Sequence, residues 1–461
     1  MTLLIKNGTL VDDKLIYKAD ILIDNEKIVK ISPNISPESF DHSANIKILD
    51  ASGRYIMPGF IDAHTHFHLV SRGTVTADDF ENGSELAAFG GVTTVIDFSD
   101  HERGKSLTES AEDRLSEMNG RMQIDYSLHQ GVYGHGFNDS ISKEIPKLKD
   151  MGISALKIFT TYKETGYLLE NEKQLSELFR LSAKYNMLVT AHCEYNPIIE
   201  STFKNYKGDF SPSAHAVLRP DTAESEAIRI YGEIALKENC PLYVVHTSSE
   251  KGYEEIKKLR NKGARVYMET TPTYLFLDKT CLQNKDGALY IMTPPLRDKK
   301  DNTCLQNAVL NGDVDVVASD HCTFTLEQKL SHSDVRSTFP GIPGTEEIFV
   351  LLNTFRLSNS DLFSLNHMVD LISTQPAKLF GIYPEKGSLK EGTDADLVIV
   401  DLDKEWILTN DTVHSNAKYT AYNNVKVKGF VETTILRGEI IMEDNHYVSK
   451  TGRGRFIKQN L

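Results

Sequence analysis

The feature of this sequence that most constrains its fold is a repeated alternation of short apolar runs with longer stretches of helical pattern. Such stretches lie at Glu172–Tyr185, Thr222–Glu238 and Glu250–Lys262. This alternation is typical of βα units, whose strands form a parallel sheet. The candidate strands are Phe60–Ala63, Thr94–Phe98, Ile124–Leu128, Ala155–Phe159, Met187–Ala191, Leu242–Val245, Arg265–Met268 and Val314–Ser319. Eight parallel strands close a TIM barrel, so we expect a (β/α)8 fold. An open, doubly wound sheet is the alternative, but no glycine-rich phosphate-binding turn follows an early strand.

Both ends of the chain differ from its middle, because short alternating runs of β-strand character replace the βα pattern. Near the N-terminus, Asn7-Gly8 separates two such runs, and Ile21–Ile31 has the pattern of a hairpin. Similar runs occupy Asp396–Val400, Val425–Lys428 and Thr433–Leu436. We therefore expect a small β-sandwich domain built from residues 1–57 and 386–461, with the barrel at residues 58–385. Two unrelated β caps are the alternative.

Composition excludes several classes of partner. The net charge is −14, whereas proteins that bind nucleic acids or anionic membranes present a basic face. The five cysteines include no CxxC pair, so we expect free thiols rather than a disulfide framework. No apolar run has the length of a signal peptide core or of a membrane-spanning helix, which needs about 18 residues. We expect a soluble cytoplasmic protein without a nucleic-acid or membrane partner.

Polar side chains with metal-binding chemistry stand at several of the candidate strands. Because the carboxyl ends of parallel barrel strands converge on one face, these side chains would meet in one mouth. They are His64 and His66 after the first run, Lys157 in the fourth, His192 and His246 after the fifth and sixth, and Asp320 after the eighth.

Each of these residues also has an ordinary structural interpretation. A lone histidine at a strand end is usually a satisfied core or rim residue, and a lysine such as Lys157 can extend past apolar neighbours to water. Asp320 could cap a helix. The pair His64 and His66 is more informative, because alternate residues of a strand face the same side. The joint pattern favours a metal site, since every candidate belongs to a strand end and none to an expected helix face.

The mixture of ligands indicates how many ions the site would hold. Four histidines and one aspartate exceed what one catalytic ion with an open position needs, but they suit two divalent ions that share a bridging ligand. Imidazole and carboxylate favour Zn, with Mn, Fe or Co as alternatives. A neutral buried lysine can react with carbon dioxide to form a carbamate, so a carboxylated Lys157 could bridge the two ions. Paired ions lower the pKa of bound water toward about 7 and so generate a hydroxide.

Several segments of the chain have distinctive sequences. Residues 58–66 read Pro-Gly-Phe-Ile-Asp-Ala-His-Thr-His, residues 157–159 Lys-Ile-Phe, and residues 245–249 Val-His-Thr-Ser-Ser. Residues 293–297 read Thr-Pro-Pro-Leu-Arg, and residues 319–322 Ser-Asp-His-Cys. Together these motifs resemble the dihydropyrimidinases and D-hydantoinases of the amidohydrolase superfamily, most of all the D-phenylhydantoinase branch, over essentially the whole chain. The resemblance implies hydrolytic ring opening of cyclic amides or ureides, such as 5-substituted hydantoins or dihydropyrimidines.

The resemblance also implies a role for each site residue. The metal ligands would be His64, His66 and Asp320 for the more buried ion, His192 and His246 for the second, and carboxylated Lys157 as a bridge beside the hydroxide. Asp320 would be the general base and then the general acid. Tyr162 would donate a hydrogen bond to the developing oxyanion. The backbone at Thr293 and Pro340 would contact the substrate ring. A homo-oligomer, either a tetramer or a dimer, is implied as well.

Three positions depart from the family pattern. His68 stands where dihydroorotases have an arginine for the substrate carboxylate, so we expect little activity on dihydroorotate. Pro340 replaces an asparagine whose backbone contacts the ring, and proline lacks an N–H. The segment Thr271–Tyr274 replaces a Cys-Pro-Gln/His-Tyr segment.

Other functions compete with this interpretation. Allantoinase is the nearest alternative activity, and dihydroorotase is the next. Some relatives have lost metal ligands and act as scaffold or interaction proteins, but all six ligand positions are filled here, which favours an enzyme. Phe67, Phe159 and Tyr167 could line an apolar pocket for a ring substituent, with ordinary packing as the alternative.

Overall fold

The centre of the molecule is a closed barrel of parallel strands. The computed structural model describes residues 2–37 and 46–461. Its eight-stranded parallel sheet has the order β15-β14-β13-β12-β11-β10-β9-β6. The ring closes beside β6, where Thr65 and His321 form a parallel bridge and the N–H of His66 donates to the carbonyl of His321 (2.8 Å). The strands are β6 (Phe60–Thr65), β9 (Val92–Ser99), β10 (Asp125–Gly131), β11 (Ala155–Phe159), β12 (Leu188–His192), β13 (Leu242–Val244), β14 (Val266–Thr270) and β15 (Val316–Val317). All eight expected strands are confirmed.

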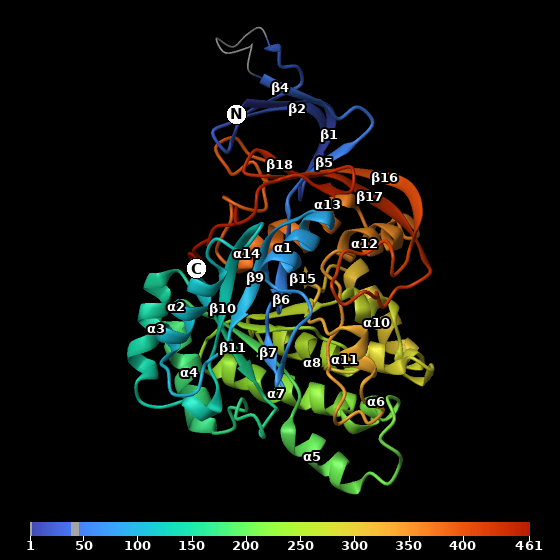
Figure 1. The fold of residues 1–461 in the computed structure, drawn as a ribbon. Coiled ribbons are helices and arrows are strands. Elements are labelled where there is room, and N and C mark those ends of the chain that lie inside the picture. The colour runs from blue at the N-terminus through green and yellow to red at the C-terminus, as the bar shows by residue number, and fades with distance from the viewer. Residues whose placement is uncertain (1, 38–45) are drawn as a thin grey trace.

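Helices surround the barrel, and at least one follows each strand (Figure 1). The longer ones are α1 (Phe80–Phe89), α2 (Leu107–Met118), α3 (Ile141–Met151), α4 (Glu172–Lys184), α5 (Asn196–Asn205), α7 (Asp221–Lys237), α8 (Glu250–Asn261), α10 (Lys299–Leu310) and α12 (Ile348–Leu357). The three helices expected from the sequence, now α4, α7 and α8, agree to within one residue at each end. Side chains of Asn171 and Ser249 accept backbone N–H groups at the starts of α4 and α8, which explains where these two helices begin.

Shorter elements occupy the loops after the barrel strands. They are the hairpin β7 (Val70–Ser71) and β8 (Thr74–Val75) and the helices α6 (Ala214–Leu218), α9 (Pro272–Phe276), α11 (Leu326–Leu330), α13 (Leu365–Val369) and α14 (Gln375–Leu379). Short 3-10 turns lie at Gly134–Gly136, Lys279–Gln283 and Gly287–Tyr290, and a π-helical turn lies at Asp370–Thr374. In (β/α)8 barrels these loops build the active site.

The two ends of the chain form one separate, mostly antiparallel sheet, as expected. Its order is β19-β18-β17-β16-β5-β1-β2-β3, with β4 paired to β1. The strands are β1 (Thr2–Val11), β2 (Ile16–Asp24), β3 (Lys27–Ser32), β4 (Ile46–Asp50), β5 (Tyr55–Pro58), β16 (Leu397–Leu408), β17 (Val425–Leu436), β18 (Glu439–Glu443) and β19 (His446–Tyr447). Residues from both chain ends, such as Ile5, Ile21 and Ile435, share one hydrophobic core. Figure 1 shows this sheet at one end of the molecule, beside the barrel.

Two local details of the terminal sheet differ from the expectation. Asn7-Gly8 is not a turn between strands, because β1 runs through it with a bulge between Ile5 and Gly8. Asn7 has a left-handed backbone (φ 63°), and its N–H donates to Asp20 Oδ1 (2.9 Å), so a tertiary contact holds the bulge. The two expected strands at residues 425–428 and 433–436 are one continuous strand, β17.

A buried ion cluster joins the terminal sheet to the barrel. The ammonium of Lys386 lies 2.5 Å from Asp125 on β10, 2.9 Å from Asp394 and 2.7 Å from Asp396. Arg437, at the end of β17, also pairs with Asp125. Three clustered carboxylates could in principle bind a cation, but here the lysine already occupies their centre. The C-terminal tail packs on the barrel as well, through a bridge between Tyr126 and Phe456.

No helix in the described part of the chain is both long enough and apolar enough to span a membrane. The five cysteines all lie within the described residues, and each has a free thiol, as expected from their number and spacing.

Candidate active site

All the site residues expected from the sequence line one cavity at the carboxyl ends of the barrel strands. The cavity has a volume of about 280 Å³. The expected residues in its wall are His64, His66, Lys157, Tyr162, His192, His246, Thr293, Asp320 and Pro340. They come from segments far apart in the chain, and the barrel brings them together.

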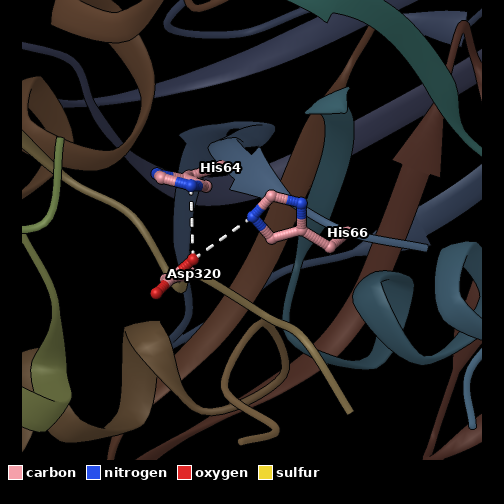
Figure 2. A group of neighbouring side chains, drawn as sticks. All are labelled: His64, His66 and Asp320. Atoms are coloured by element: carbon pink, nitrogen blue, oxygen red, sulfur yellow. Dashed lines mark ion pairs between the residues drawn. The ribbon is translucent and has the colours of Figure 1, made fainter. Parts of the chain in front are cut away.

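Three of the expected ligands form the tightest group in the cavity (Figure 2). The Nε2 atoms of His64 and His66 lie 3.2 Å and 3.4 Å from the same carboxylate oxygen of Asp320. Burial would raise the pKa of Asp320, but the neighbouring His64 and His66 hold it below its ordinary value. Asp320 is therefore an anion at neutral pH, facing two imidazole nitrogens.

A glutamate that the sequence interpretation missed orients this group. Glu269 is the penultimate residue of β14, is fully buried, and lies 2.8 Å from Nδ1 of His64. It also accepts from the backbone N–H of His246 and the hydroxyl of Tyr243, both at 2.8 Å. Burial raises its pKa to about 8. A carboxylate behind a metal-binding histidine fixes the ring and its tautomer. An acidic residue at the end of the seventh barrel strand was the signal available in the sequence.

His192 and His246 form a second pair. Nδ1 of His192 lies 3.0 Å from Nε2 of His246. The other ring nitrogen of His192 contacts Glu194 (2.7 Å), which in turn pairs with Arg219 (2.6 Å). Burial lowers the pKa of both histidines, so their rings are neutral, which is the form that binds metal ions. Glu194 and Arg219 were also missed, although Glu194 stands only two residues after a predicted ligand.

Lys157 is fully buried in the middle of the site. Its ammonium nitrogen lies above the rings of Phe98 (4.8 Å) and Phe159 (5.1 Å), and no hydrogen-bond acceptor reaches it among the described residues. Burial lowers the pKa of Lys157 to about 8. Its charge also contributes to lowering the pKa of His192 and of His246, after the larger effect of burial, so it lies within electrostatic range of that pair.

The backbone is strained at three of these residues. Tyr162 (φ 64°), His246 (φ 40°) and Asp320 (φ 54°) all have left-handed conformations, which side chains other than glycine rarely adopt. Such strain is retained where the surrounding structure imposes it, and it concentrates at functional sites.

The residues expected to contact the substrate face the same cavity from its loops. Tyr162 is half-buried, with its ring 5.5 Å from that of His192. Burial raises the pKa of Tyr162, so its hydroxyl keeps its proton at neutral pH. Thr293 and Pro340 lie on two further loops. The hydroxyl of Tyr274 donates to the carbonyl of Pro294 (2.6 Å). The segment Thr271–Tyr274, which differs from the family's sequence pattern, therefore supports the loop that carries Thr293.

The expected apolar wall is present in part. Phe159 and Tyr167 line the cavity, joined by Leu69, Val70 and Phe324. Phe67 instead packs in the main core against His321, because its side chain points away from the mouth. His68 lines a neighbouring hollow rather than this cavity.

This chain is similar to known proteins over essentially its whole length. Residues 55–441 match a protein family described as the amidohydrolase family. The chain is 36% identical to a D-hydantoinase from Geobacillus stearothermophilus over 466 residues, which cover 100% of this chain and 97% of the relative. It is 35% identical to a D-phenylhydantoinase from Escherichia coli over 465 residues, covering 100% and 98%. The solved structure of a dihydropyrimidinase from Brevibacillus agri NCHU1002 superposes with a TM-score of 0.94 at 34% identity, covering 100% and 99%.

Proposed function

Because this chain belongs to the amidohydrolase family, we propose that it hydrolyses cyclic amides of the hydantoin and dihydropyrimidine type. Water would add across a ring C–N bond, so that the carbonyl carbon becomes a carboxylate and the ring nitrogen gains a proton. The observation that carries the proposal is the convergence on one cavity of nine residues, six expected from the strand-end pattern and three from the family resemblance.

The donor set fits divalent metal ions. Nε2 of His64 is buried in the wall of the cavity and accepts no hydrogen bond from any described residue, and its nearest charged neighbour is the Asp320 carboxylate at 3.2 Å. Burial lowers the pKa of His64 far below its ordinary value, so this nitrogen offers a lone pair rather than a proton. Neutral imidazoles beside an ionised carboxylate are the ligands that zinc and similar ions prefer.

We assign the ligands as they were expected. One ion would be held by His64, His66 and Asp320, and a second by His192 and His246. Lys157 suits the bridging role, because burial lowers its pKa to about 8 and so makes the neutral amine more accessible. A neutral amine can add carbon dioxide and become an anionic carbamate. When bound, the ions would polarise the ring carbonyl and lower the pKa of bound water toward about 7.

Asp320 would move the proton of the reaction. Its lowered pKa keeps it ionised, as a general base must be before it takes a proton from water. The same carboxyl group would then deliver that proton to the departing ring nitrogen. Asp320 lies beside both His64 and His66, and this position would give its carboxylate access to the reacting atoms.

Tyr162 would stabilise the negative charge that develops on the ring carbonyl oxygen. Its protonated hydroxyl is a donor at the cavity wall, and such donors act mainly on the transition state.

Thr293 and Pro340 would position the ring through backbone groups. Pro340 has no N–H, and the N–H of Gly341 already donates to the carbonyl of Ile291 (2.9 Å). The ammonium of Lys329 holds the carbonyls of Phe339 (2.9 Å) and Gly341 (3.0 Å). The loop therefore offers an acceptor, the Pro340 carbonyl, rather than a donor, and would bind a ring N–H.

The test combines metal analysis with a substrate panel. We expect about two divalent ions per chain, loss of activity on chelation and recovery when zinc, manganese or cobalt is added back. Turnover of 5-phenylhydantoin or dihydrouracil should exceed that of dihydroorotate, with allantoin as a further comparison. Faster turnover of dihydroorotate than of the other three rings would refute the assignment. From the family resemblance we also propose a cytoplasmic homo-oligomer, a dimer or tetramer, which light scattering would identify.

A further inference from the structure

Arg72 stands where the site cavity meets a second, larger cavity. The second cavity has a volume of about 520 Å³ and shares four lining residues with the first. The shared residues are Arg72, Tyr162, Thr293 and Pro340. Three of these are the residues assigned to hold the substrate ring. A ring held there would therefore have Arg72 beside the passage into which a ring substituent extends.

The backbone of Arg72 is fixed by a tight hairpin. Strands β7 and β8 pair Ser71 with Thr74, and the two residues between them, Arg72 (φ 49°) and Gly73 (φ 78°), both have left-handed backbones. This geometry is that of a type I′ turn, which usually carries asparagine or glycine at its first position. An arginine is thus held at an unfavourable position in a loop over the site.

The side chain of Arg72 has a fixed contact but no counter-ion. One guanidinium nitrogen donates to the carbonyl of Thr338 (3.1 Å). The other arginines of the second cavity are neutralised, since Arg219 pairs with Glu194 (2.6 Å) and Arg336 with Asp334. Among the described residues, no carboxylate pairs with Arg72. Its remaining guanidinium N–H groups are free to bind an anion, and a guanidinium binds a carboxylate through two parallel hydrogen bonds.

The other charges of the second cavity limit where an anion can sit. Glu164 and Glu200 also line it, and Glu200 accepts from the side chain of Asn196 (2.7 Å). Both glutamates are exposed, and neither lines the first cavity. An anion in the second cavity away from the junction would come near these carboxylates, whereas one at the junction would meet Arg72. The apolar wall of Leu69 and Val70 beside Arg72 suits a short methylene linker.

We propose that Arg72 makes this protein selective for cyclic amides whose ring substituent is a short methylene chain that ends in a carboxylate. Dihydroorotate is outside this class, because its carboxylate is attached directly to the ring. The inference rests on the proposed function, because it concerns the substituent of a ring that the same site would hydrolyse. The preferred ring substituent would therefore be anionic rather than purely apolar.

The test compares two hydantoins of the same size that differ only in charge, 5-(2-carboxyethyl)hydantoin and its primary amide, 5-(2-carbamoylethyl)hydantoin. The metal-loaded protein should have a kcat/KM for the acid at least about 10-fold above that for the amide, as expected for one charge-assisted hydrogen bond. Arg72→Gln should lower kcat/KM for the acid by about 10- to 100-fold and leave that for the amide within about twofold. Arg72→Lys should retain part of the preference.

Arg103→Gln is the matched control. Arg103 lies beside the neighbouring hollow and, like Arg72, donates to a loop carbonyl, that of Thr165. Arg103→Gln should leave the ratio of kcat/KM for the acid to kcat/KM for the amide unchanged, because Arg103 does not line the site cavity. An equal fall of the ratio in both variants would show a general charge effect and overturn the role of Arg72. Hydrolysis of the amide at least as fast as the acid by the wild type would overturn the inference and leave the proposed function intact. Failure to hydrolyse any hydantoin would overturn both.

Discussion

Two buried lysines of this chain show how the same residue type can serve different purposes. Lys329 is fully buried and donates to three carbonyls, those of Ile291, Phe339 and Gly341, at 2.8–3.0 Å. Lys157 is equally buried, but its nitrogen lies above two aromatic rings and forms no hydrogen bond within the described part of the chain. A buried amine without acceptors is unfavourable unless something else uses it.

The first prediction is therefore that Lys157→Ala loses both bound metal and activity while the fold is retained. An ammonium would repel two dications, whereas a carbamate would bind both, so the residue should act as a ligand. Metal content by mass spectrometry and turnover of 5-phenylhydantoin are the measurements. Acetate or propionate added with metal should restore some activity.

Lys329→Ala is the control for that experiment. It removes a buried lysine of the same size, so it should lower thermal stability but keep the metal. About two ions per chain and near-normal kcat in Lys157→Ala would exclude the bridged site.

The second prediction concerns Tyr162. If its hydroxyl stabilises the oxyanion, Tyr162→Phe should lower kcat by roughly 10²- to 10³-fold, the usual effect of removing one such donor. Metal content should not change. Tyr167→Phe is the matched control, because Tyr167 also lines the cavity but stacks on Tyr133 (4.2 Å). A similar fall of kcat in both variants would argue against a specific role for Tyr162.

The sequence could predict the positions of the candidate ligands better than those of the residues that support them. His64, His192 and Asp320 were predictable because each comes directly at or after a strand end, and barrel geometry decides where strand ends meet. Glu269 has the same position but was overlooked, since a lone glutamate has no distinctive spacing. Arg72 could not be identified from the sequence, because its role depends on a hairpin and a junction between cavities that only the folded chain contains.

At the scale of elements, barrel strands and their helices were predicted well because both faces of a parallel sheet are covered. Every residue of β9 is buried, and its apolar residues Val92, Val95, Ile96 and Phe98 are interspersed with four polar ones. The terminal sheet was harder. Whether Asn7-Gly8 makes a turn or a bulge depends on Asp20, a residue on the next strand that local propensity does not include.

The third prediction concerns the start of α12. Glu347 precedes this helix, is buried, and accepts a hydrogen bond from the hydroxyl of Thr420 (2.8 Å). Burial, with a contribution from Glu346, raises the pKa of Glu347 from 4.5 to about 7. The folded protein therefore binds a proton more tightly than the unfolded chain, and this contribution to stability is present below pH 4.5 and lost as the pH rises through 7.

A shift of this size corresponds to about 3 kcal/mol at most. Glu347→Gln keeps an acceptor for Thr420 but cannot ionise, so its stability relative to wild type should increase between pH 5 and pH 8. Melting temperatures at both values, with metal saturating, would measure the difference. Glu112→Gln, on the exposed side of α2, is the control and should show no such trend. A parallel pH profile for Glu347→Gln and wild type would contradict the prediction.

At the scale of the whole molecule, the cluster around Lys386 holds the barrel and the terminal sheet together. It places one ammonium among three buried carboxylates contributed by both parts. We propose that the domain boundaries lie between residues 57 and 58 and between residues 385 and 386. Lys386 is then the first residue of the C-terminal segment of the β domain.

The fourth prediction is that Lys386→Met strongly destabilises the protein. Removing one partner of a buried ion pair costs about 3–5 kcal/mol, because the remaining carboxylates lose their counter-ion. Lys378→Met is the control, since Lys378 also pairs across elements, with Asp13 (3.2 Å), but is 38% exposed. Exposed pairs contribute less than about 1 kcal/mol. Chemical denaturation of both variants would measure the contrast, and equal midpoints would refute it.

The closure of the barrel has a consequence for the order in which the protein matures. The seam lies between β6 and the segment after the two-residue strand β15, and His64, His66 and Asp320 stand on its two sides. During synthesis the two histidines leave the ribosome long before the aspartate does. A nascent chain therefore holds only part of the proposed ligand set, which becomes complete only after the first and last strands have met. An ion bound by these residues would then stabilise the closed ring, so metal binding would follow folding rather than start it.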